Sequence, residues 1–309
     1  MEEFAGKVAF ITGGVSGIGM GLAKAAAEAG MKVAITYRRE DSLQPIKAWF
    51  AERPDLTLFP VKLEVTDRDG WVRAVDEVEA GLGPIDLLCN NAGVGVIGPM
   101  EQATYADWDW VMGVNVGGVV NGVMTVVPRM IARGEGGHIV NVSSVGGLAA
   151  LGTAGIYCAS KFAVVGLSEA LRGDLAVHGI GVSVYCPGPV KSNIGEAGKK
   201  RPADLAETGY RPPAGPDAAP VKGSISFTDA WMEPEEAGRR ILEGVRTNRL
   251  YILSHAELKG AIKERHDAID ASWPDEAPNQ ALCDSIPNLL TTQAYVDEIA
   301  LGPPDFSRR

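Results

Sequence analysis

The stretch VAFITGGVSGIG, residues 8–19, joins a short apolar run to a glycine turn and then to a helical pattern. The apolar run is typical of a buried strand, and residues 17–29 place apolar side chains on one helical face. Gly13, Gly17 and Gly19 permit a tight turn and a close approach of the backbone to a phosphate group. A helix beginning there would offer free N–H groups to an anion. The alternative is a glycine-rich turn that binds nothing.

The same alternation continues along the chain. Further apolar runs lie at 33–37, 56–65, 85–90, 138–143, 181–186 and 250–253, and helical patterns lie at 42–52, 67–82, 103–132, 156–178 and 235–247. The apolar runs are mostly continuous, as expected for strands covered by helices on both faces. The sequence therefore predicts an α/β fold, a doubly wound, Rossmann-type parallel sheet of seven strands with helices on both faces.

Two regions depart from this repeat. Residues 191–230 are irregular and rich in proline, and long irregular segments of this kind are often lids over binding sites. Residues 255–309 form an acidic tail in which we expect one or two helices. We therefore expect a catalytic domain over 1–254, which includes the lid, and a C-terminal extension that packs on this domain or on a neighbouring subunit.

Composition excludes several classes of function. The formal net charge is −10, and no block of Lys and Arg is present, so binding to nucleic acid or to an anionic membrane is disfavoured. No apolar stretch reaches the ~20 residues of a membrane span. The N-terminus lacks a signal-peptide pattern, so we expect a cytoplasmic protein. The histidines, His255 among them, share no metal-ligand spacing, and we expect no metal site.

A catalytic pattern stands at residues 157–161. Tyr157 and Lys161 are four residues apart, so both side chains would lie on one face of a helix. A free tyrosine has a pKa near ~10, and a neighbouring ammonium group would lower it. Ser144 lies thirteen residues before Tyr157, at the predicted end of a strand, and Ser143 is the alternative for the same position. The pair alone is weak evidence, because chance supplies many such spacings.

Other polar motifs stand at strand ends in a fixed order. Together they resemble the short-chain dehydrogenase/reductase family over roughly residues 5–254. The matching pieces are Thr-Gly-x-x-x-Gly-Ile-Gly at 12–19, Asn-Asn-Ala-Gly at 90–93, Asn115, Ser144, Tyr-x-x-x-Lys at 157–161, and Pro187-Gly188 followed by Val190.

The resemblance implies a role for each catalytic residue. Tyr157 would be the general acid in reduction and the general base in oxidation. Lys161 would lower the pKa of Tyr157 and bind the nicotinamide ribose, and Ser144 would polarise the substrate carbonyl. Asn115 would kink its helix and hold a water in a proton relay. The cofactor would contact Thr12, Gly13, Val15, Ser16, Gly17, Ile18, Gly19, Tyr37, Arg38, Arg39, Glu64, Val65, Asn91, Ala92, Gly93, Tyr157, Lys161, Pro187, Gly188, Val190 and Ser192.

The end of the second strand bears on the choice of cofactor. An acidic residue there would bind the 2′-hydroxyl of NAD, but this strand ends Tyr37-Arg38-Arg39. Because arginine can hold a 2′-phosphate through two hydrogen bonds, we expect NADP(H). The glycine turn lacks the basic residue of many NADP-using relatives and has Val15-Ser16 instead, so NAD(H) remains an alternative. The arginines could also be a solvated surface pair.

A narrower resemblance concerns the substrate. Residues 128–131, 191–194 and 250–252, with the extended tail, are similar to bacterial Cα-dehydrogenases that oxidise lignin-derived aryl-ether alcohols. The expected reaction therefore interconverts a secondary alcohol and a ketone, with a bulky aromatic substrate as one option. The alternatives are a lyase or epimerase on the same fold and a non-catalytic nucleotide-binding protein. In this family the helices around residues 113–122 and 157 commonly meet between subunits, so we expect a homodimer or homotetramer.

Overall fold

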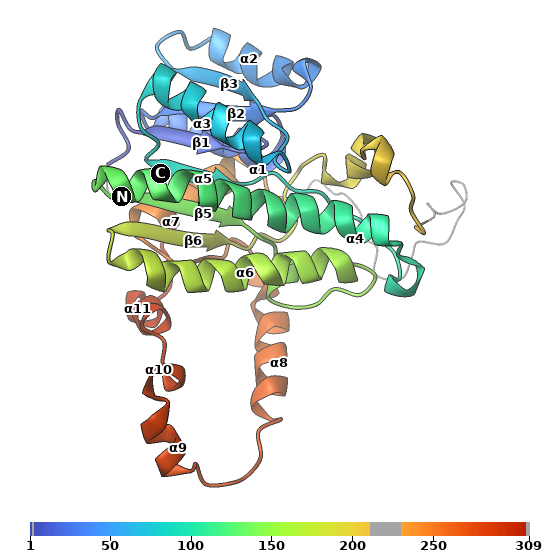
Figure 1. Ribbon diagram of the computed structural model, residues 1–309, viewed down its shortest axis with the longest axis vertical. Helices are drawn as coiled ribbons and strands as arrows, with labels where there is room; N and C mark the ends of the chain where they lie inside the picture. The colour runs from blue at the N-terminus through green and yellow to red at the C-terminus, as the bar shows by residue number, and fades with distance from the viewer. Residues whose placement is uncertain (2, 211–229, 307–309) are drawn as a thin grey trace.

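The computed structural model describes residues 1, 3–210 and 230–306, so residues 211–229 of the expected lid lie outside the described residues. Its centre is a sheet of seven parallel strands in the order β3-β2-β1-β4-β5-β6-β7 (Figure 1). The strands are β1 Val8–Ile11, β2 Lys32–Tyr37, β3 Leu58–Lys62, β4 Leu87–Asn90, β5 Gly137–Val142, β6 Ile180–Tyr185 and β7 Tyr251–Ile252. The predicted fold class is confirmed.

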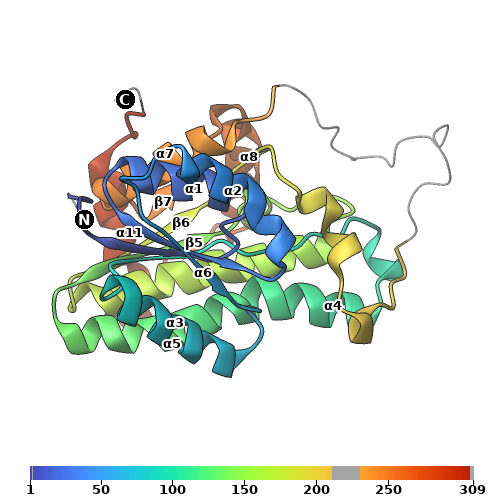
Figure 2. The same cartoon turned by 90° about the horizontal axis from the view of Figure 1, so that it is seen from above.

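Helices cover both faces of the sheet. Figure 2 shows α1, α2 and α7 on one side and α3 and α5 on the other. The helices are α1 Gly17–Glu28, α2 Gln44–Ala51, α3 Arg68–Leu82, α4 Tyr105–Met112, α5 Gly118–Arg133, α6 Gly155–Ala176, α7 Pro234–Arg246, α8 Lys259–Asp270, α9 Gln280–Ser285, α10 Pro287–Leu290 and α11 Gln293–Leu301.

Two hydrophobic cores result from this arrangement. Trp71 on α3 is fully buried in one core, and Leu22 on α1 and Ile241 on α7 are fully buried in the other. Neighbouring strand residues alternate between the two cores, as Phe10 and Ile11 do. Both faces of each central strand are therefore apolar, which explains why the strands are continuous apolar runs.

The strand order reverses between β1 and β4, which lie side by side although residues 12–86 separate them. In open α/β sheets ligands bind outside the carboxyl ends of the strands at such a point. Thr12 follows β1 there, and Asn90 ends β4. The fold thus brings the glycine turn and the Asn-Asn-Ala-Gly motif to the same edge.

The helical run Tyr105–Arg133 corrects the expectation that no segment is long and apolar enough to span a membrane. At 29 residues it is long and apolar enough to cross a membrane by length and composition, although no segment was expected to qualify. It packs on the sheet instead, and Val119, Val126 and Val127 are buried in the core. A core helix of this kind meets the same length and composition test, because its apolar face is turned to the sheet.

The C-terminal tail also differs from expectation. We expected one or two helices, but the described tail contains α8, α9, α10 and α11. Figure 1 shows α8 leading away from the sheet, α9 at the far end, and α11 returning beside α6. Trp273, Leu282 and Leu289 are exposed on this arm.

Candidate active site

The glycine turn has the geometry of an anion-binding site. Gly13 and Gly17 have φ values of +66° and +51°, which favour glycine. Helix α1 follows at once, its N-cap Ser16 makes no side-chain cap, and no acidic residue stands in its first turn. Its first N–H groups are therefore available to an anion. A Cβ on Gly17 would lie 2.7 Å from the Cβ of Ser192, so the segment after β6 closes over this turn.

Asn91 and Thr12 connect the turn to the end of β4. The amide Nδ2 of Asn91 donates to the Thr12 carbonyl at 2.8 Å and to the Gly13 carbonyl at 3.3 Å. The Oγ1 of Thr12 accepts hydrogen bonds from the backbone N–H groups of Asn91 and Ala92 at 2.9 and 3.0 Å. These bonds fix two neighbouring strand ends in one rigid cradle.

Ser144, Tyr157 and Lys161 are brought together at the same edge. The Ser144 side chain lies near enough to the Tyr157 hydroxyl to act against the effect of burial on its pKa. The Nζ of Lys161 donates to the Val142 carbonyl at 3.0 Å and lies 5.5 Å from the centroid of the Tyr157 ring. The Oγ of Ser143 donates instead to the Lys161 carbonyl at 2.8 Å. Ser144 is therefore the serine that faces Tyr157, and Ser143 is committed to holding α6 against the sheet.

Burial dominates the acid–base properties of this group. Burial raises the pKa of Tyr157 to about 12, although the Ser144 side chain acts in the opposite direction. Burial also lowers the pKa of Lys161 to about 8. Tyr157 is therefore a neutral hydrogen-bond donor at neutral pH. The expected effect of the Lys161 ammonium on the Tyr157 pKa stays a prediction, because burial is the largest influence on that pKa.

Asn115 lies in a single π-helical turn, Gly113–Gly117, between α4 and α5. This turn interrupts the α-helical repeat at the residue for which a kink was predicted. The buried amide donates to the Val94 carbonyl at 3.0 Å and to the Ser160 hydroxyl at 2.9 Å, and its Oδ1 accepts from the Val94 N–H at 2.8 Å. A Cβ on Gly93 would lie 3.3 Å from that Oδ1 and 3.6 Å from the Lys161 Nζ. The side chain thus joins the loop after β4 to α6, beside Lys161.

The two arginines after β2 are paired with carboxylates. Arg38 lies 3.2 Å from Glu64, and both side chains are exposed. Arg39 is paired with Asp41. Val65 is buried, and its carbonyl accepts hydrogen bonds from Trp71 and Asn121 in the core. Glu64 therefore pairs with Arg38 at the exposed surface, and the sequence did not predict this pair.

The turn after β6 is held by a residue that the sequence analysis set aside. The Nδ1 of His255 accepts a hydrogen bond from the Gly188 N–H at 3.1 Å, so the Nε2 carries the proton and donates to the Pro189 carbonyl at 3.1 Å. The Pro187 carbonyl accepts from the Val145 N–H at 2.8 Å. His255 has no telling spacing in the sequence, and only its position just after the last strand could have pointed to it.

Four further residues of the predicted cofactor site lie near the carboxyl ends of the strands. Val190 is buried and bridges to Met232, so the turn after β6 is fixed from a second side. Val15, Ile18 and Tyr37 are partly buried and pack against the core around α1.

Apolar side chains flank the Ser144–Tyr157 pair. A Cβ on Gly95 would lie 3.5 Å from Ile194 and 3.9 Å from the Tyr157 ring. A Cβ on Gly146 would lie 3.5 Å from the Ser144 Oγ and 3.6 Å from Leu151. Two hydroxyl groups between aliphatic walls can bind one polar atom of a molecule that is otherwise apolar.

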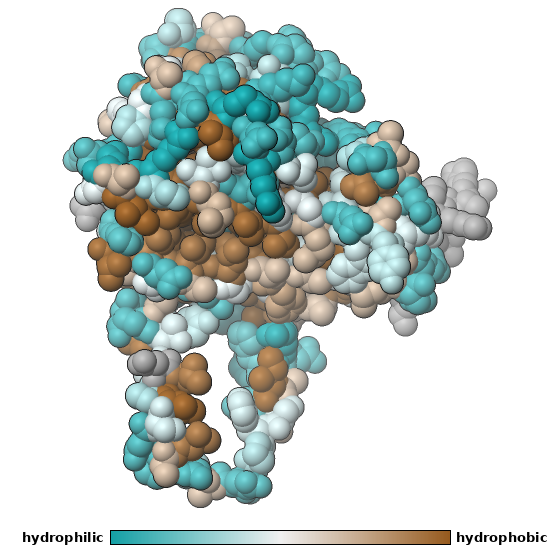
Figure 3. Space-filling model, in the orientation of Figure 1, coloured by the Kyte–Doolittle hydropathy of each residue, from teal (hydrophilic) through white to brown (hydrophobic). Residues whose placement is uncertain are grey.

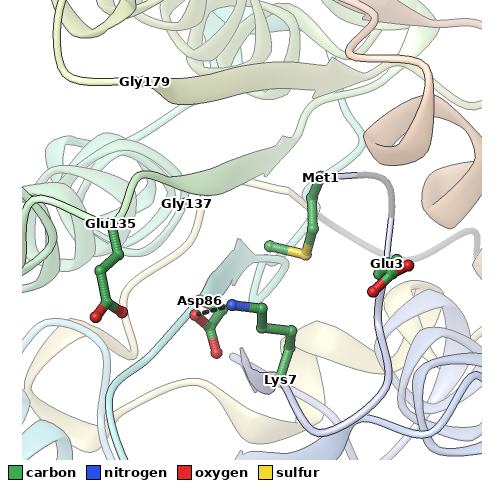
Figure 4. A pocket seen from close by; sticks show the side chains of 7 residues that line it. All are labelled: Met1, Glu3, Lys7, Asp86, Glu135, Gly137 and Gly179. Carbon is green, nitrogen blue, oxygen red and sulfur yellow. Dashed lines mark ion pairs between the residues drawn. The ribbon is translucent and has the colours of Figure 1, made fainter.

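A separate pocket lies at the opposite edge of the sheet (Figure 4). It is lined by Met1, Glu3, Lys7, Asp86, Glu135, Gly137 and Gly179, which precede or begin the strands. Its carboxylate Asp86 lies 3.6 Å from Lys7 and 3.3 Å from Arg133, and it accepts a hydrogen bond from the Val8 N–H. Asp86 therefore serves to hold the strand starts together.

Comparison with known proteins agrees with this geometry. The model of the short chain dehydrogenase family matches residues 7–202. A Cα-dehydrogenase of Sphingobium sp. is 42% identical over 279 residues, which are 90% of this chain and 90% of that protein. The apo structure of LigO from Sphingobium sp. is 39% identical with a TM-score of 0.71, and the match covers 99% of this chain and 100% of LigO. A short chain dehydrogenase/reductase from Burkholderia phymatum in complex with NAD is 32% identical with a TM-score of 0.79, over 90% of this chain and 99% of that one.

Proposed function

The chain belongs to the short-chain dehydrogenase/reductase family of oxidoreductases that act on CH–OH groups, and on this premise we propose that it interconverts a secondary alcohol and a ketone with NADP(H). The observation that carries the proposal is the cluster of Ser144, Tyr157 and Lys161, in which the Lys161 Nζ lies 5.5 Å from the centroid of the Tyr157 ring. Such a cluster can bind a carbonyl oxygen and deliver a proton to it.

Each side chain has a defined task in this proposal. Ser144 and Tyr157 donate hydrogen bonds to the substrate oxygen, and Tyr157 transfers its proton to that oxygen in reduction. Lys161 is held in place by the Val142 carbonyl, and its charge favours the phenolate left behind. Asn115 fixes the loop after β4 beside Lys161, and the free lone pair on its Oδ1 can hold a water for proton return.

The residues present fit a dinucleotide. The N-terminus of α1 and the turn with Gly13 and Gly17 would hold the pyrophosphate, and the cradle of Thr12 and Asn91 would keep the turn rigid. The buried turn from Pro187 to Val190 would hold the nicotinamide side. When bound, the cofactor supplies or accepts the hydride, and its oxidised ring favours the phenolate of Tyr157 by its positive charge.

Preference for NADP(H) rests on Arg38 and Arg39. Each arginine now pairs with a surface carboxylate, and exposed ion pairs contribute only about 0–1 kcal/mol. A 2′-phosphate accepting two hydrogen bonds from a guanidinium group would outweigh such a pair. The second candidate is NAD(H), which is favoured because both guanidinium charges are already balanced and because the relative from Burkholderia phymatum binds NAD.

A bulky, largely apolar substrate is the most consistent choice. Leu151 and Ile194 flank the two hydroxyl groups, and Val96 and Leu148 are partly buried near the same edge. The Cα-dehydrogenase similarity over 90% of the chain supports a secondary alcohol as the substrate class. An aryl ketone would place its ring against these walls and its oxygen on the hydroxyl pair.

A turnover screen tests the function directly. Purified protein is given aromatic and aliphatic ketones with NADPH and, in parallel, with NADH, and the loss of reduced cofactor is followed by absorbance. We expect turnover of bulky aryl ketones with NADPH in preference to NADH. Product formed without net change in the cofactor would instead support a lyase or epimerase, and cofactor binding without any turnover would support a non-catalytic role.

The proposal also covers the domain bounds, the location and the subunit number of the protein. We propose a catalytic domain over 1–254 and an extension over 255–309 in a cytoplasmic homodimer or homotetramer. Figure 3 shows apolar side chains gathered over α5 and α6, where Met124 and Ile131 are exposed, and this face supports subunit contact. Light scattering on a sizing column would give the subunit number, and a strictly monomeric active protein would contradict it.

A further inference from the structure

A buried ion pair joins α4 to the segment 191–210 that follows β6. The Nη1 of Arg201 lies 2.5 Å from the Oδ1 of Asp107, and the side chains are 7% and 0% exposed. The guanidinium group also lies 5.0 Å from the centre of the Trp110 ring. Removing one partner of such a pair would leave an uncompensated buried charge, so the pair holds the two segments together firmly.

Each guanidinium nitrogen of Arg201 and each carboxylate oxygen of Asp107 makes a hydrogen bond. Arg201 donates to the Leu205 carbonyl and, at 2.7 Å, to the Glu207 carbonyl. Asp107 accepts at its Oδ2 from the N–H groups of Thr104 at 2.9 Å and Gly209 at 3.3 Å. Burial alone would raise the pKa of Asp107, but these hydrogen bonds and Arg201 outweigh it and lower that pKa to about 2. The carboxylate is therefore ionised at neutral pH.

The segment contacts the candidate active site near its start, and its end covers the loop after β4. Ser192 packs on Gly17 of the glycine turn, and Ile194 lies beside Gly95 and the Tyr157 ring. At the other end the Tyr210 ring covers Gly98, where a Cβ would lie 2.0 Å from its Cδ1. Arg201 is the anchor between these ends, so its position sets where the wall formed by Ile194 and Tyr210 stands.

We propose that Arg201 and Asp107 are positioning residues that set the substrate preference by holding an apolar wall, with Ile194 beside Tyr157 and Tyr210 over Gly98 in the loop after β4. The proposal rests on the proposed function for its substrate, an aryl ketone or the matching secondary alcohol. Neither residue touches that substrate. A fixed wall favours large flat molecules that fill the site, and a displaced wall loses these contacts while small ketones lose little.

The test compares Arg201→Gln with the control Arg239→Gln, which breaks an exposed pair with Glu236 on α7. We measure kcat and KM for a bulky aryl ketone and for a small aliphatic ketone, and the dissociation constant of NADPH by fluorescence. In Arg201→Gln the KM for the aryl ketone should rise by at least about tenfold, while kcat and NADPH binding change by less than about threefold. The small ketone should be nearly unaffected, and the control should match the unchanged protein.

The outcomes separate the explanations. An unchanged KM for the aryl ketone, or an equal loss for both ketones, would overturn the proposal. Arg201→Lys keeps the charge but not the planar fork that reaches both carbonyls, so an intermediate KM is expected. Full recovery with lysine would mean that charge alone matters and would contradict the positioning role.

A second readout needs no activity. Trypsin can cut after Lys199 and Lys200, which are exposed next to Arg201. Cleavage there, mapped by mass spectrometry, should be at least about tenfold faster in Arg201→Gln and in Asp107→Asn than in Arg239→Gln. Asparagine keeps the carbonyl that caps Thr104 but turns an N–H group toward Arg201. Equal cleavage rates would overturn the anchor itself, whereas faster cleavage in a protein that turns over no ketone would point to a failure of the proposed function.

Discussion

Burial of Tyr157 and Lys161 decides how the reaction should depend on pH. Tyr157, with a pKa of about 12, stays protonated through the neutral range, and Lys161, with a pKa of about 8, is charged below that pH. The charged lysine stabilises the phenolate that forms as the proton leaves. Above about pH 8 Lys161 loses its proton, so kcat/KM for ketone reduction should fall as the pH rises. A pH profile measures this, and a value that stays constant to about pH 10 would contradict it.

The pair of Arg38 and Glu64 gives a second prediction at single residues. Glu64→Gln removes the carboxylate that now occupies Arg38, so NADPH should bind more tightly and NADH should be unchanged. Arg38→Ala should weaken NADPH by about tenfold, because a charge-assisted pair of hydrogen bonds is lost. Titration of both cofactors by fluorescence checks the two variants together. Equal effects on NADPH and NADH would argue that Arg38 does not read the 2′-phosphate.

The positions of single site residues were predictable from the sequence where a polar side chain stands at or just after the end of a predicted strand. Ser144, Tyr157 and Asn91 each stand at a fixed place in a strand–turn–helix unit, so the local pattern located them at one edge. The pairing of Arg38 with Glu64 was not predictable, because it depends on how β2 and β3 lie in register. The burial that raises the pKa of Tyr157 could not be predicted either, because burial is set by the whole fold.

Between elements, His255 links the end of β7 to the turn after β6. The variant His255→Leu removes both hydrogen bonds to Gly188 and Pro189, so the turn should loosen and both NADPH and NADH should bind more weakly by about tenfold. His266→Leu is the matched control, because that histidine is exposed on α8. Calorimetry measures the dissociation constants of NADPH and NADH for both variants and so tests whether His255 holds the turn. Unchanged binding in His255→Leu would show that the turn holds its shape without the imidazole.

Contacts between distant elements explain what sequence patterns could not locate. His255 lies 67 residues from Gly188, and Arg201 lies 94 residues from Asp107. Neither pair has a characteristic spacing, and each residue alone is typical of a solvated surface. By contrast, the sequence showed which segments are helices and which are strands, because the alternation of strand and helix repeats along the whole sheet.

For the whole molecule, the tail returns to support the last strand. Glu298 on α11 accepts a hydrogen bond from the Leu250 N–H at 2.6 Å and lies 3.5 Å from the buried Arg249 guanidinium. Glu298→Ala should lower the free energy of unfolding by about 1–3 kcal/mol, because a buried N–H group and a buried charge lose their partner. Urea unfolding measures this, with the exposed neighbour Asp297→Ala as the control. Equal stability of the two variants would contradict a structural role for α11.

The tail was the part of the molecule least open to prediction. Its helices α9 and α10 span Gln280–Ser285 and Pro287–Leu290, lengths at which local periodicity gives almost no signal. Its attachment through Glu298 depends on contacts with Arg249 and Leu250, just before β7 and some fifty residues earlier in the chain. The sheet was predictable because every strand repeats one pattern, and the tail repeats none.

The measurement that tests the central claim most directly is ketone turnover by Tyr157→Phe, together with NADPH binding by the same variant. Phenylalanine keeps the buried ring but removes the hydroxyl that lies near Ser144 and would donate the proton. We predict that turnover falls by at least about a thousandfold while NADPH binds as in the unchanged protein. Turnover within about tenfold of the unchanged protein, with cofactor binding intact, would contradict the assignment of Tyr157 as the proton donor.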